Sequence, residues 1–125
     1  MTTITEAFSG FAVPDLDAAD AFYRDVLGLA VERDAMGIST LTLPDGTPIL
    51  VYPKPDHRPA VYTILNFVVP DIDAAVADLT SRGIELLRYD GFDHDEKGIV
   101  RSTGDGPTIC WFTDPAENVL SFIQN

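Results

Sequence analysis

Apolar residues recur every three or four positions along Leu16–Leu27, which is the spacing of a helix that buries one face. Pro14 ends the segment before this stretch, and Asp15 stands where a helix N-cap is expected. Gly28 follows the last apolar position and supplies a left-handed stop. The pattern therefore predicts an extended segment over Ile4–Val13 followed by a helix.

The same pattern returns further along the chain. Phe11–Phe22, FAVPDLDAADAF, and Phe67–Asp78, FVVPDIDAAVAD, are identical at eight positions and start 56 residues apart. In the second copy Pro70 and Asp71 open the predicted helix and Gly83 closes it. A unit this short usually cannot close its own core, so an internal duplication predicts two copies that pack together.

Short β candidates separated by Gly, Asp and Pro turns follow each predicted helix. They are Ala30–Asp34, Ile38–Leu43 and Pro48–Tyr52 in the first half, and Ile84–Asp90, Gly98–Thr103, Thr108–Phe112 and Val119–Gln124 in the second. The second half has one candidate too many, so we expect one of its earlier pieces to be broken or merged. Each half then reads βαβββ. The sequence predicts one α+β domain, 1–125, made of module 1–53 and module 61–125, with a Pro-rich connector at 53–60.

Composition mainly excludes partners. The 125 residues include 20 acidic and 8 basic side chains, a net charge of −12, which repels both nucleic acid and anionic membranes. Charges or prolines interrupt every hydrophobic stretch, and no secretory leader opens the sequence, so we expect a cytoplasmic protein with no nucleic-acid or membrane partner. Cys110 is the only cysteine, which we interpret as a buried strand residue and not as a nucleophile.

The stretches VPDLDAADAFYRDVLGL at 13–29 and FTDPAENVLSF at 112–122, within βαβββ twice, resemble the vicinal oxygen chelate superfamily. This group includes glyoxalase I, extradiol dioxygenases, fosfomycin-resistance transferases and bleomycin-resistance proteins. The resemblance spans nearly the whole chain. It implies two modules whose curved mixed sheets surround a groove, and a homodimer.

In that family a divalent metal is held by His or Glu side chains of the first and last strands. The corresponding positions here are Phe8, Val51, Ile64 and Ser121. A shift of one residue in the first module would put Leu50 or Tyr52 in place of Val51. None of these side chains is a good metal ligand, so we expect no metal and no other cofactor, and the usual metal-dependent reactions are not supported.

Alternation along the strands then suggests which side chains face the groove. The ligand-binding candidates are Phe8, Tyr52, Tyr62, Ile64, Asn66, Trp111 and Ser121. The aromatic members are equally consistent with core or dimer packing. Asn66 and Glu6 would be polar groups in an apolar groove, where a ligand is one available partner.

The chain has two histidines. His57 lies in the connector, where a solvent-exposed role is expected. His94 lies in GFDHDEKG, residues 91–98, which is typical of a solvated turn. Two alternatives remain for this segment: a metal held by residues 93–96, or a mobile lip over the groove with His94 as general acid or base. His94 and Glu6 are thus the two candidate catalytic residues.

The leading hypothesis is a metal-free member of the superfamily that binds a small organic molecule in an apolar groove, as bleomycin-resistance proteins sequester a drug. One alternative is a lyase, isomerase or dioxygenase-like enzyme with a non-standard or misregistered active site. Another is an accessory domain that acts through its dimer surface. The sequence identifies neither the ligand nor a reaction.

Overall fold

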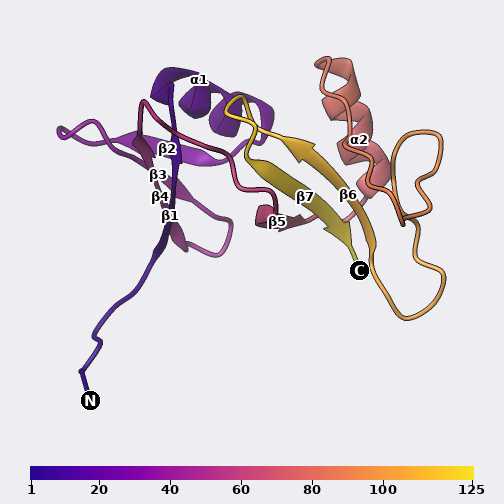
Figure 1. Cartoon of the computed structure of the whole chain (residues 1–125), viewed down its shortest axis with the longest axis horizontal. Coiled ribbons are helices and arrows are strands. Elements are labelled where there is room, and N and C mark those ends of the chain that lie inside the picture. The colour runs from indigo at the N-terminus through magenta and orange to yellow at the C-terminus, as the bar shows by residue number, and fades with distance from the viewer. The chain divides into compact units, whose positions relative to one another are not determined.

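The computed structural model describes all of residues 1–125. The chain forms two compact units, Met1–Arg58 and Pro59–Asn125, and the boundary between them falls inside the Pro-rich segment 53–60 (Figure 1). Each unit contains a mixed β-sheet with helical structure packed on one face, so the predicted α+β fold is confirmed. No helix is long and apolar enough to span a membrane.

The first unit has a four-stranded sheet in the order β1-β4-β3-β2. Its elements are β1 (Ser9–Val13), α1 (Leu16–Ala21), the π-helical turn η1 (Phe22–Val26), β2 (Ala30–Arg33), β3 (Ser39–Thr42) and β4 (Pro48–Pro53). β1 runs parallel to β4, and the other neighbours are antiparallel. A strand, a crossover helix and a return to a parallel neighbour is the connection that the predicted βαβββ order requires.

Helix α1 begins where the sequence predicts. The Asp15 side chain accepts a hydrogen bond from the backbone N–H of Ala18 at 3.1 Å, as an N-cap does. The buried stripe continues through η1, where Tyr23 is fully buried and its ring lies 5.7 Å from that of Phe11 on β1. Odd-numbered residues of β1 therefore face the helix.

A buried carboxylate ties α1 to the sheet. Asp20 accepts a hydrogen bond from the Ser39 hydroxyl on β3 at 2.6 Å and forms an ion pair with Arg33 on β2 at 2.7 Å. Arg33 also pairs with Asp17 on α1, which raises the pKa of the guanidinium. The Asp20 carboxylate is thus paired with a cation on β2 and hydrogen-bonded from β3, as a buried acid requires.

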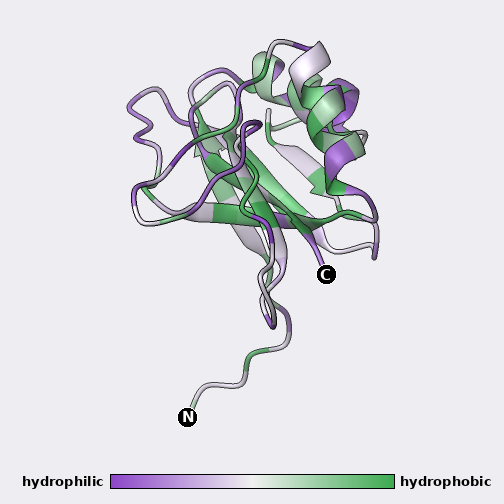
Figure 2. Cartoon of the chain, turned by 90° about the vertical axis from the view of Figure 1, so that its right-hand side faces the viewer, coloured by the Kyte–Doolittle hydropathy of each residue, from purple (hydrophilic) through white to green (hydrophobic).

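The second unit has a three-stranded sheet in the order β5-β7-β6. Its elements are β5 (Thr63–Val68), α2 (Ile72–Ser81), β6 (Thr108–Thr113) and β7 (Val119–Gln124). Asp71 caps α2 through the Ala74 N–H, repeating the role of Asp15. Apolar residues of α2 and of one sheet face form the core: Ile72, Val76, Leu79, Cys110, Phe112, Leu120 and Phe122. Figure 2 shows hydrophobic positions on helices and strands and hydrophilic ones mostly in the connections.

Two predicted strands of the second unit are wrong. Ile84–Asp90 and Gly98–Thr103 each contribute a single bridging residue, Leu87 opposite Trp111 and Val100 opposite Ile109. Both segments occupy the same outer edge of β6 within two residues of each other. Neither can extend along that edge without displacing the other, whereas in the first unit β2 has the matching edge of β3 to itself. The sequence predicts one broken strand in the second unit, and the structure has two.

The first strand begins at Ser9 and not at Ile4. Ser9 pairs with Ile49 of β4, so the next partner for Phe8 would be Pro48, which has no N–H to donate. Residues 1–8 instead continue as an exposed arm, visible at the N-terminus in Figure 1. Glu6 and Phe8 lie in this arm, before the first strand and outside the sheet.

Candidate functional site

The second unit presents a sheet face that is turned away from α2, which we call the open face. Leu120 and Phe122 of β7 pack in the core beneath α2, so alternation places Ser121 and Ile123 on the opposite side. Strand pairing then defines two rows across the open face. The first row is Asn66, Ser121, Trp111 and Leu87, and the second is Val68, Ile123, Ile109 and Val100.

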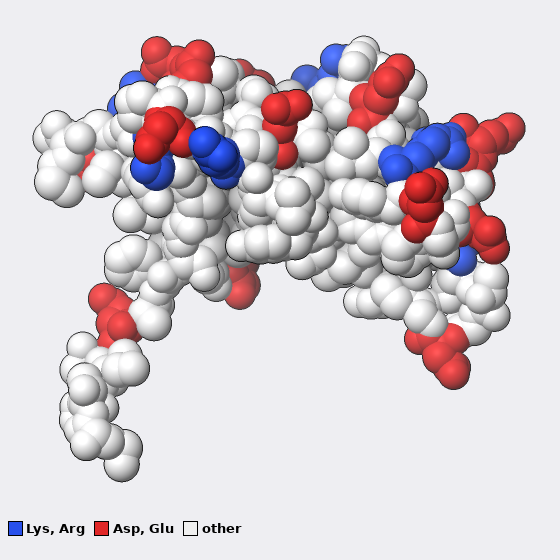
Figure 3. All heavy atoms as spheres, in the orientation of Figure 1, with Lys and Arg blue, Asp and Glu red and all other residues white.

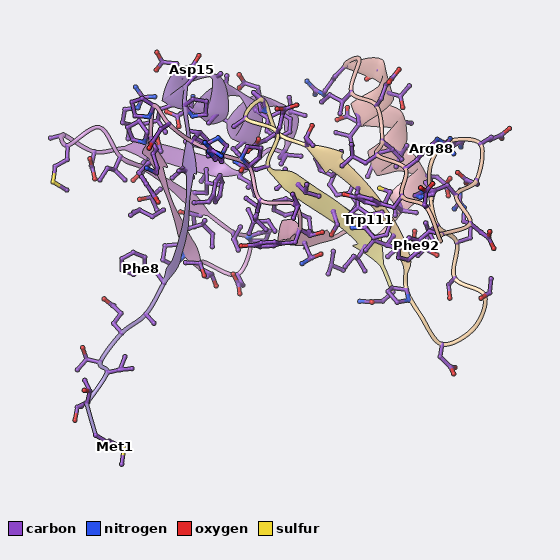
Figure 4. All side chains as sticks on the ribbon, in the orientation of Figure 1. Met1, Phe8, Asp15, Arg88, Phe92 and Trp111 are labelled. Atoms are coloured by element: carbon purple, nitrogen blue, oxygen red, sulfur yellow. The ribbon has the colours of Figure 1, made fainter.

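Aromatic rings gather around Trp111 at one end of the first row. The Trp111 ring lies 5.1 Å from Tyr89 in an edge-to-face arrangement and 5.2 Å from Phe92. His94 completes this aromatic cluster at 6.1 Å from Trp111. Phe92 remains 52% exposed, and Figure 4 shows it beside Trp111 on the segment that leads into β6. The cluster therefore offers accessible ring surface, which is the chemistry that receives flat apolar molecules.

His94 holds the segment that carries Tyr89 and Phe92. Its Nε2 accepts a hydrogen bond from the Tyr89 N–H at 3.0 Å, and its Nδ1 lies 2.7 Å from the Gly98 carbonyl oxygen. A carbonyl only accepts, so Nδ1 carries the proton and Nε2 is the acceptor, which defines a neutral ring. Both nitrogens are occupied within the protein. His94 is therefore a positioning residue in this geometry, and a free general base at this place is not observed.

Gly98 makes the tight return of this segment possible. Its φ of 102° lies in the left-handed region, and a Cβ at this position would lie 3.0 Å from the Leu86 Cβ. Only glycine is accommodated there without strain. The position of the Gly98 carbonyl that His94 contacts thus depends on a glycine, and the sequence pattern predicted this glycine only as a turn residue.

An ion network ties the same segment to the first turn of α2. Arg101 donates two hydrogen bonds to the Asp73 carboxylate and one to Asp95. The Asp95 carboxylate also accepts from the backbone N–H groups of Lys97 and Ile99. The Arg101 hydrogen bonds lower the pKa of Asp73 to about 2. Residues 95–101 are therefore held against α2 by contacts that local sequence patterns do not reveal.

Asn66 and Ser121 form a polar pair at the other end of the first row. The fully buried Ser121 hydroxyl donates a hydrogen bond to the Asn66 Oδ1 at 2.6 Å. Asn66 itself is exposed on the edge strand β5. The pair is thus an oriented amide beside apolar and aromatic neighbours, which places Asn66, Ser121 and Trp111 of the predicted set on one face.

The remaining predicted residues do not join this row. Tyr62 precedes β5 and is 69% exposed, and Phe8 in the N-terminal arm is 62% exposed. Ile64 lies at a bulge, because Thr63 pairs with Val119 while Leu65 pairs with Leu120. The bulge interrupts alternation between Thr63 and Leu65, whereas Asn66 and Val68 beyond it share one face as alternation predicts. Pairing with Ser121 places Asn66 on the open face.

In the first unit the predicted register is wrong by one residue. Val51 is fully buried and lies on the helix side, opposite Phe11. The position that matches Ser121 is Leu50, which pairs with Gly10 as Ser121 pairs with Asn66. Tyr52 shares the face of Leu50 and is partly exposed. The first-unit row is thus Gly10, Leu50, Thr40 and Glu32, without a ring.

No group of three His, Cys, Asp or Glu side chains converges as a metal site requires. In segment 93–96, His94 and Asp95 are engaged by the contacts described above. Glu6 lies in the exposed N-terminal arm. Burial raises the pKa of the Cys110 thiol to about 11, so this side chain is a neutral thiol at neutral pH and a poor nucleophile.

A separate hollow of about 530 Å³ lies at the C-terminal end of α2. Its lining is Thr80, Gly83, Ile84, Glu85, Leu86, Arg88, Glu96 and Lys97. Charged side chains of both signs line it, and it shares no residue with the two rows of the open face. Figure 3 likewise shows acidic and basic groups dispersed over the surface in view. We therefore assign the apolar site to the open face and not to this hollow.

The chain is an α+β protein with two mixed sheets, and in each unit a capped helix follows the first strand, which pairs in parallel with the last strand of that unit. The first unit has the order βαβββ, and the second keeps this order with its middle strands reduced to isolated bridges and β6. The model of the Glyoxalase/Bleomycin resistance protein/Dioxygenase superfamily matches residues 7–122, and the chain belongs to this family. The family predicted from the two sequence stretches is thereby confirmed. None of the curated proteins compared with the chain matches it significantly.

Solved structures share the fold at low sequence identity. The genomically encoded fosfomycin resistance protein FosX from Listeria monocytogenes superimposes with a TM-score of 0.75 at 11% identity, covering 99% of this chain and 95% of that one. TnmS3, an antibiotic binding protein from Streptomyces sp. CB03234, gives 0.65 at 21% identity, with 98% of each chain covered. A superfamily member from Sphaerobacter thermophilus DSM 20745 gives 0.69 at 21%, covering 97% and 98%. At these identities the likeness shows the fold alone.

Proposed function

We propose that this chain binds a small, flat organic molecule on the open face of its second unit, in the cytoplasm, as a homodimer and without a metal or other cofactor. The aromatic cluster around Trp111 is the observation that carries the proposal. Phe92 and Tyr89 keep ring surface accessible beside an apolar row, and stacked rings contribute about 0.5–1.5 kcal/mol beyond the area they bury.

The reactive side chains of the chain support binding of a ligand over its chemical conversion. His94 uses both ring nitrogens to hold its own segment, and the Cys110 thiol is buried and protonated at neutral pH. The antibiotic binding protein TnmS3 has the same fold, which shows that the fold is compatible with this role. Sequestration of a drug-like compound is thus the function that these residues favour. The homodimer comes from the family resemblance, and light scattering on the purified protein tests it.

Trp111 is the only tryptophan of the chain, so its indole N–H gives one assigned signal at the proposed site. We would titrate ¹⁵N-labelled protein with bleomycin, with fosfomycin and with 9-fluorenone as a flat aromatic probe, and follow the chemical shift of the indole N–H by NMR. A saturable change of this chemical shift, with the compound recovered unchanged by mass spectrometry, supports the proposal. No saturable movement with any of the three contradicts it, and a chemically altered compound would favour the enzyme alternative.

Phe92→Ala is the matched test of the cluster. It removes an exposed ring that contacts Trp111, so we expect the affinity for 9-fluorenone to fall by about 2- to 10-fold. Phe8→Ala is the control, because Phe8 is also a largely exposed ring but lies in the N-terminal arm and is not a residue of the open face. Equal losses in both variants would show nonspecific hydrophobic binding.

A further inference from the structure

The polar end of the first row has an unused hydrogen-bonding capacity. Ser121 occupies the Asn66 carbonyl oxygen at 2.6 Å, and the Asn66 amide nitrogen donates to no group of the protein. Ser121 is fully buried on the central strand β7, so its hydroxyl is a fixed anchor. In this contact the carbonyl end of the amide faces Ser121, so its NH₂ end is turned away from Ser121. Asn66 thus keeps both of its side-chain N–H donors available to whatever lies on the open face, while its carbonyl oxygen is held by Ser121.

We propose that Asn66 determines the specificity of this face by donating a hydrogen bond to a carbonyl oxygen of a planar ligand whose rings lie against Trp111. The inference rests on the proposed function and adds to it the chemical class of the ligand. Ser121 is then a positioning residue, because it touches Asn66 and holds its amide in the donating orientation.

Strand spacing gives the size of this ligand. Asn66, Ser121 and Trp111 are direct partners on three adjacent strands, so Asn66 and Trp111 are two strand spacings apart. Two spacings are about 10 Å. A molecule of two or three fused rings with an oxygen at its edge spans this distance, whereas a single ring reaches one end of the row only.

Charge selects a neutral acceptor. The two rows of the open face contain no Lys, Arg, Asp or Glu, and an amide N–H carries no net charge. A carboxylate or phosphate placed there would lose its hydration without an opposite charge in return, which is unfavourable. The net charge of −12 also opposes an anion. A ketone, quinone or lactam oxygen needs only the donors that Asn66 offers.

The first unit provides an internal comparison. Gly10 stands at the position of Asn66, and Leu50 at that of Ser121. A Cβ on Gly10 would lie 3.2 Å from the Leu50 carbonyl oxygen, so a longer side chain there has no free room. The donor pair is therefore a property of the second unit alone, although the two strands come from one duplicated segment.

The test compares two probes that differ at one position, 9-fluorenone and fluorene, with wild-type protein and the Asn66→Asp variant. Aspartate keeps the shape of the side chain and can still accept from Ser121, but it has no N–H. We expect Asn66→Asp to weaken 9-fluorenone binding by about 3- to 10-fold, which is the contribution of one neutral hydrogen bond. Fluorene has no oxygen to accept that bond, so its binding should be nearly unchanged. The Asn66 side-chain NH₂ signals should move with 9-fluorenone only.

Ser121→Ala tests whether Ser121 acts by orienting the Asn66 amide and not by contacting the ligand itself. We expect it to reduce the ratio of 9-fluorenone to fluorene affinity by less than Asn66→Asp does, while the Trp111 indole signal still reports both probes. If both probes move the indole signal and the Asn66 variant binds them as wild type does, this inference is overturned and the proposed function stands. If neither probe moves the indole signal, both are overturned.

Discussion

Replacing His94 separates a positioning role from a catalytic one. His94→Ala removes two hydrogen bonds, from the Tyr89 N–H and to the Gly98 carbonyl. Each is worth about 0.5–1.5 kcal/mol net, so the free energy of unfolding of the second unit should fall by about 1–3 kcal/mol. His94→Asn can place its amide nitrogen near the former Nδ1 and keep the bond to Gly98, so about half of that loss is expected.

The assay is urea denaturation followed by Trp111 fluorescence, which reports on the second unit because no other tryptophan is present. Asp93→Ala is the control: it changes the neighbouring exposed residue, whose side chain makes no hydrogen bond or ion pair, and should cost less than about 0.5 kcal/mol. Wild-type stability in His94→Ala would refute the reasoning. An equal loss in the Asn and Ala variants would refute the assignment of the Gly98 bond.

Three further outcomes follow from the same unit. Gly98→Ala should destabilise it by about 1–3 kcal/mol in the same assay, because φ is 102° and the new Cβ meets Leu86. Asp73 has its pKa lowered to about 2 by Arg101, so its contribution to stability is present above about pH 4 and is lost as pH falls toward 2; Asp73→Asn should flatten the pH dependence of the melting temperature in that range. Cys110 should resist iodoacetamide at pH 8 and react once urea unfolds the chain, since its thiol has a pKa of about 11, and rapid labelling of folded protein would contradict this.

Local signals predicted the elements that depend on nearby residues. Pro14 and Asp15 determined the start of α1, and their repeats at Pro70 and Asp71 determined the start of α2, because an N-cap acts within three residues. The stripe from Leu16 to Tyr23 predicted the buried side of the first helix correctly. These features needed no knowledge of distant partners.

Failures arose where distant segments meet. The strand predicted at Ile84–Asp90 is reduced to Leu87 because residues near Val100 take the same edge of β6, and no local pattern shows such competition. Phe8 is excluded from β1 by Pro48, which lies 40 positions away in the sequence. The bulge at Ile64 changes alternation within β5 without a glycine or proline to mark it.

The sequence predicted the part of the candidate site that lies on regular strands and missed the part that lies in an irregular segment. Alternation along the strands predicted Asn66 and Trp111, and the family's last-strand ligand position predicted Ser121. Strand pairing places the three residues in one row. Tyr89 and Phe92 were missed because they lie in a segment without regular structure, where His94 and not a strand positions them. Two aromatic residues close to a histidine in a charged, Gly-flanked run were the available signal.

The duplication itself leads to a prediction of stoichiometry. Each module contributes a sheet face opposite its helix, so an unmodified duplicate would offer two equivalent sites per chain. The first-unit row instead ends in Glu32 and has Thr40 where the second has Trp111, so it lacks both the ring and the uncharged surface. A planar carbonyl compound should therefore bind once per chain in isothermal titration calorimetry, and Trp111→Ala should abolish that binding. Two equivalent sites, or one that persists without Trp111, would place the ligand on a surface that the aromatic cluster does not define.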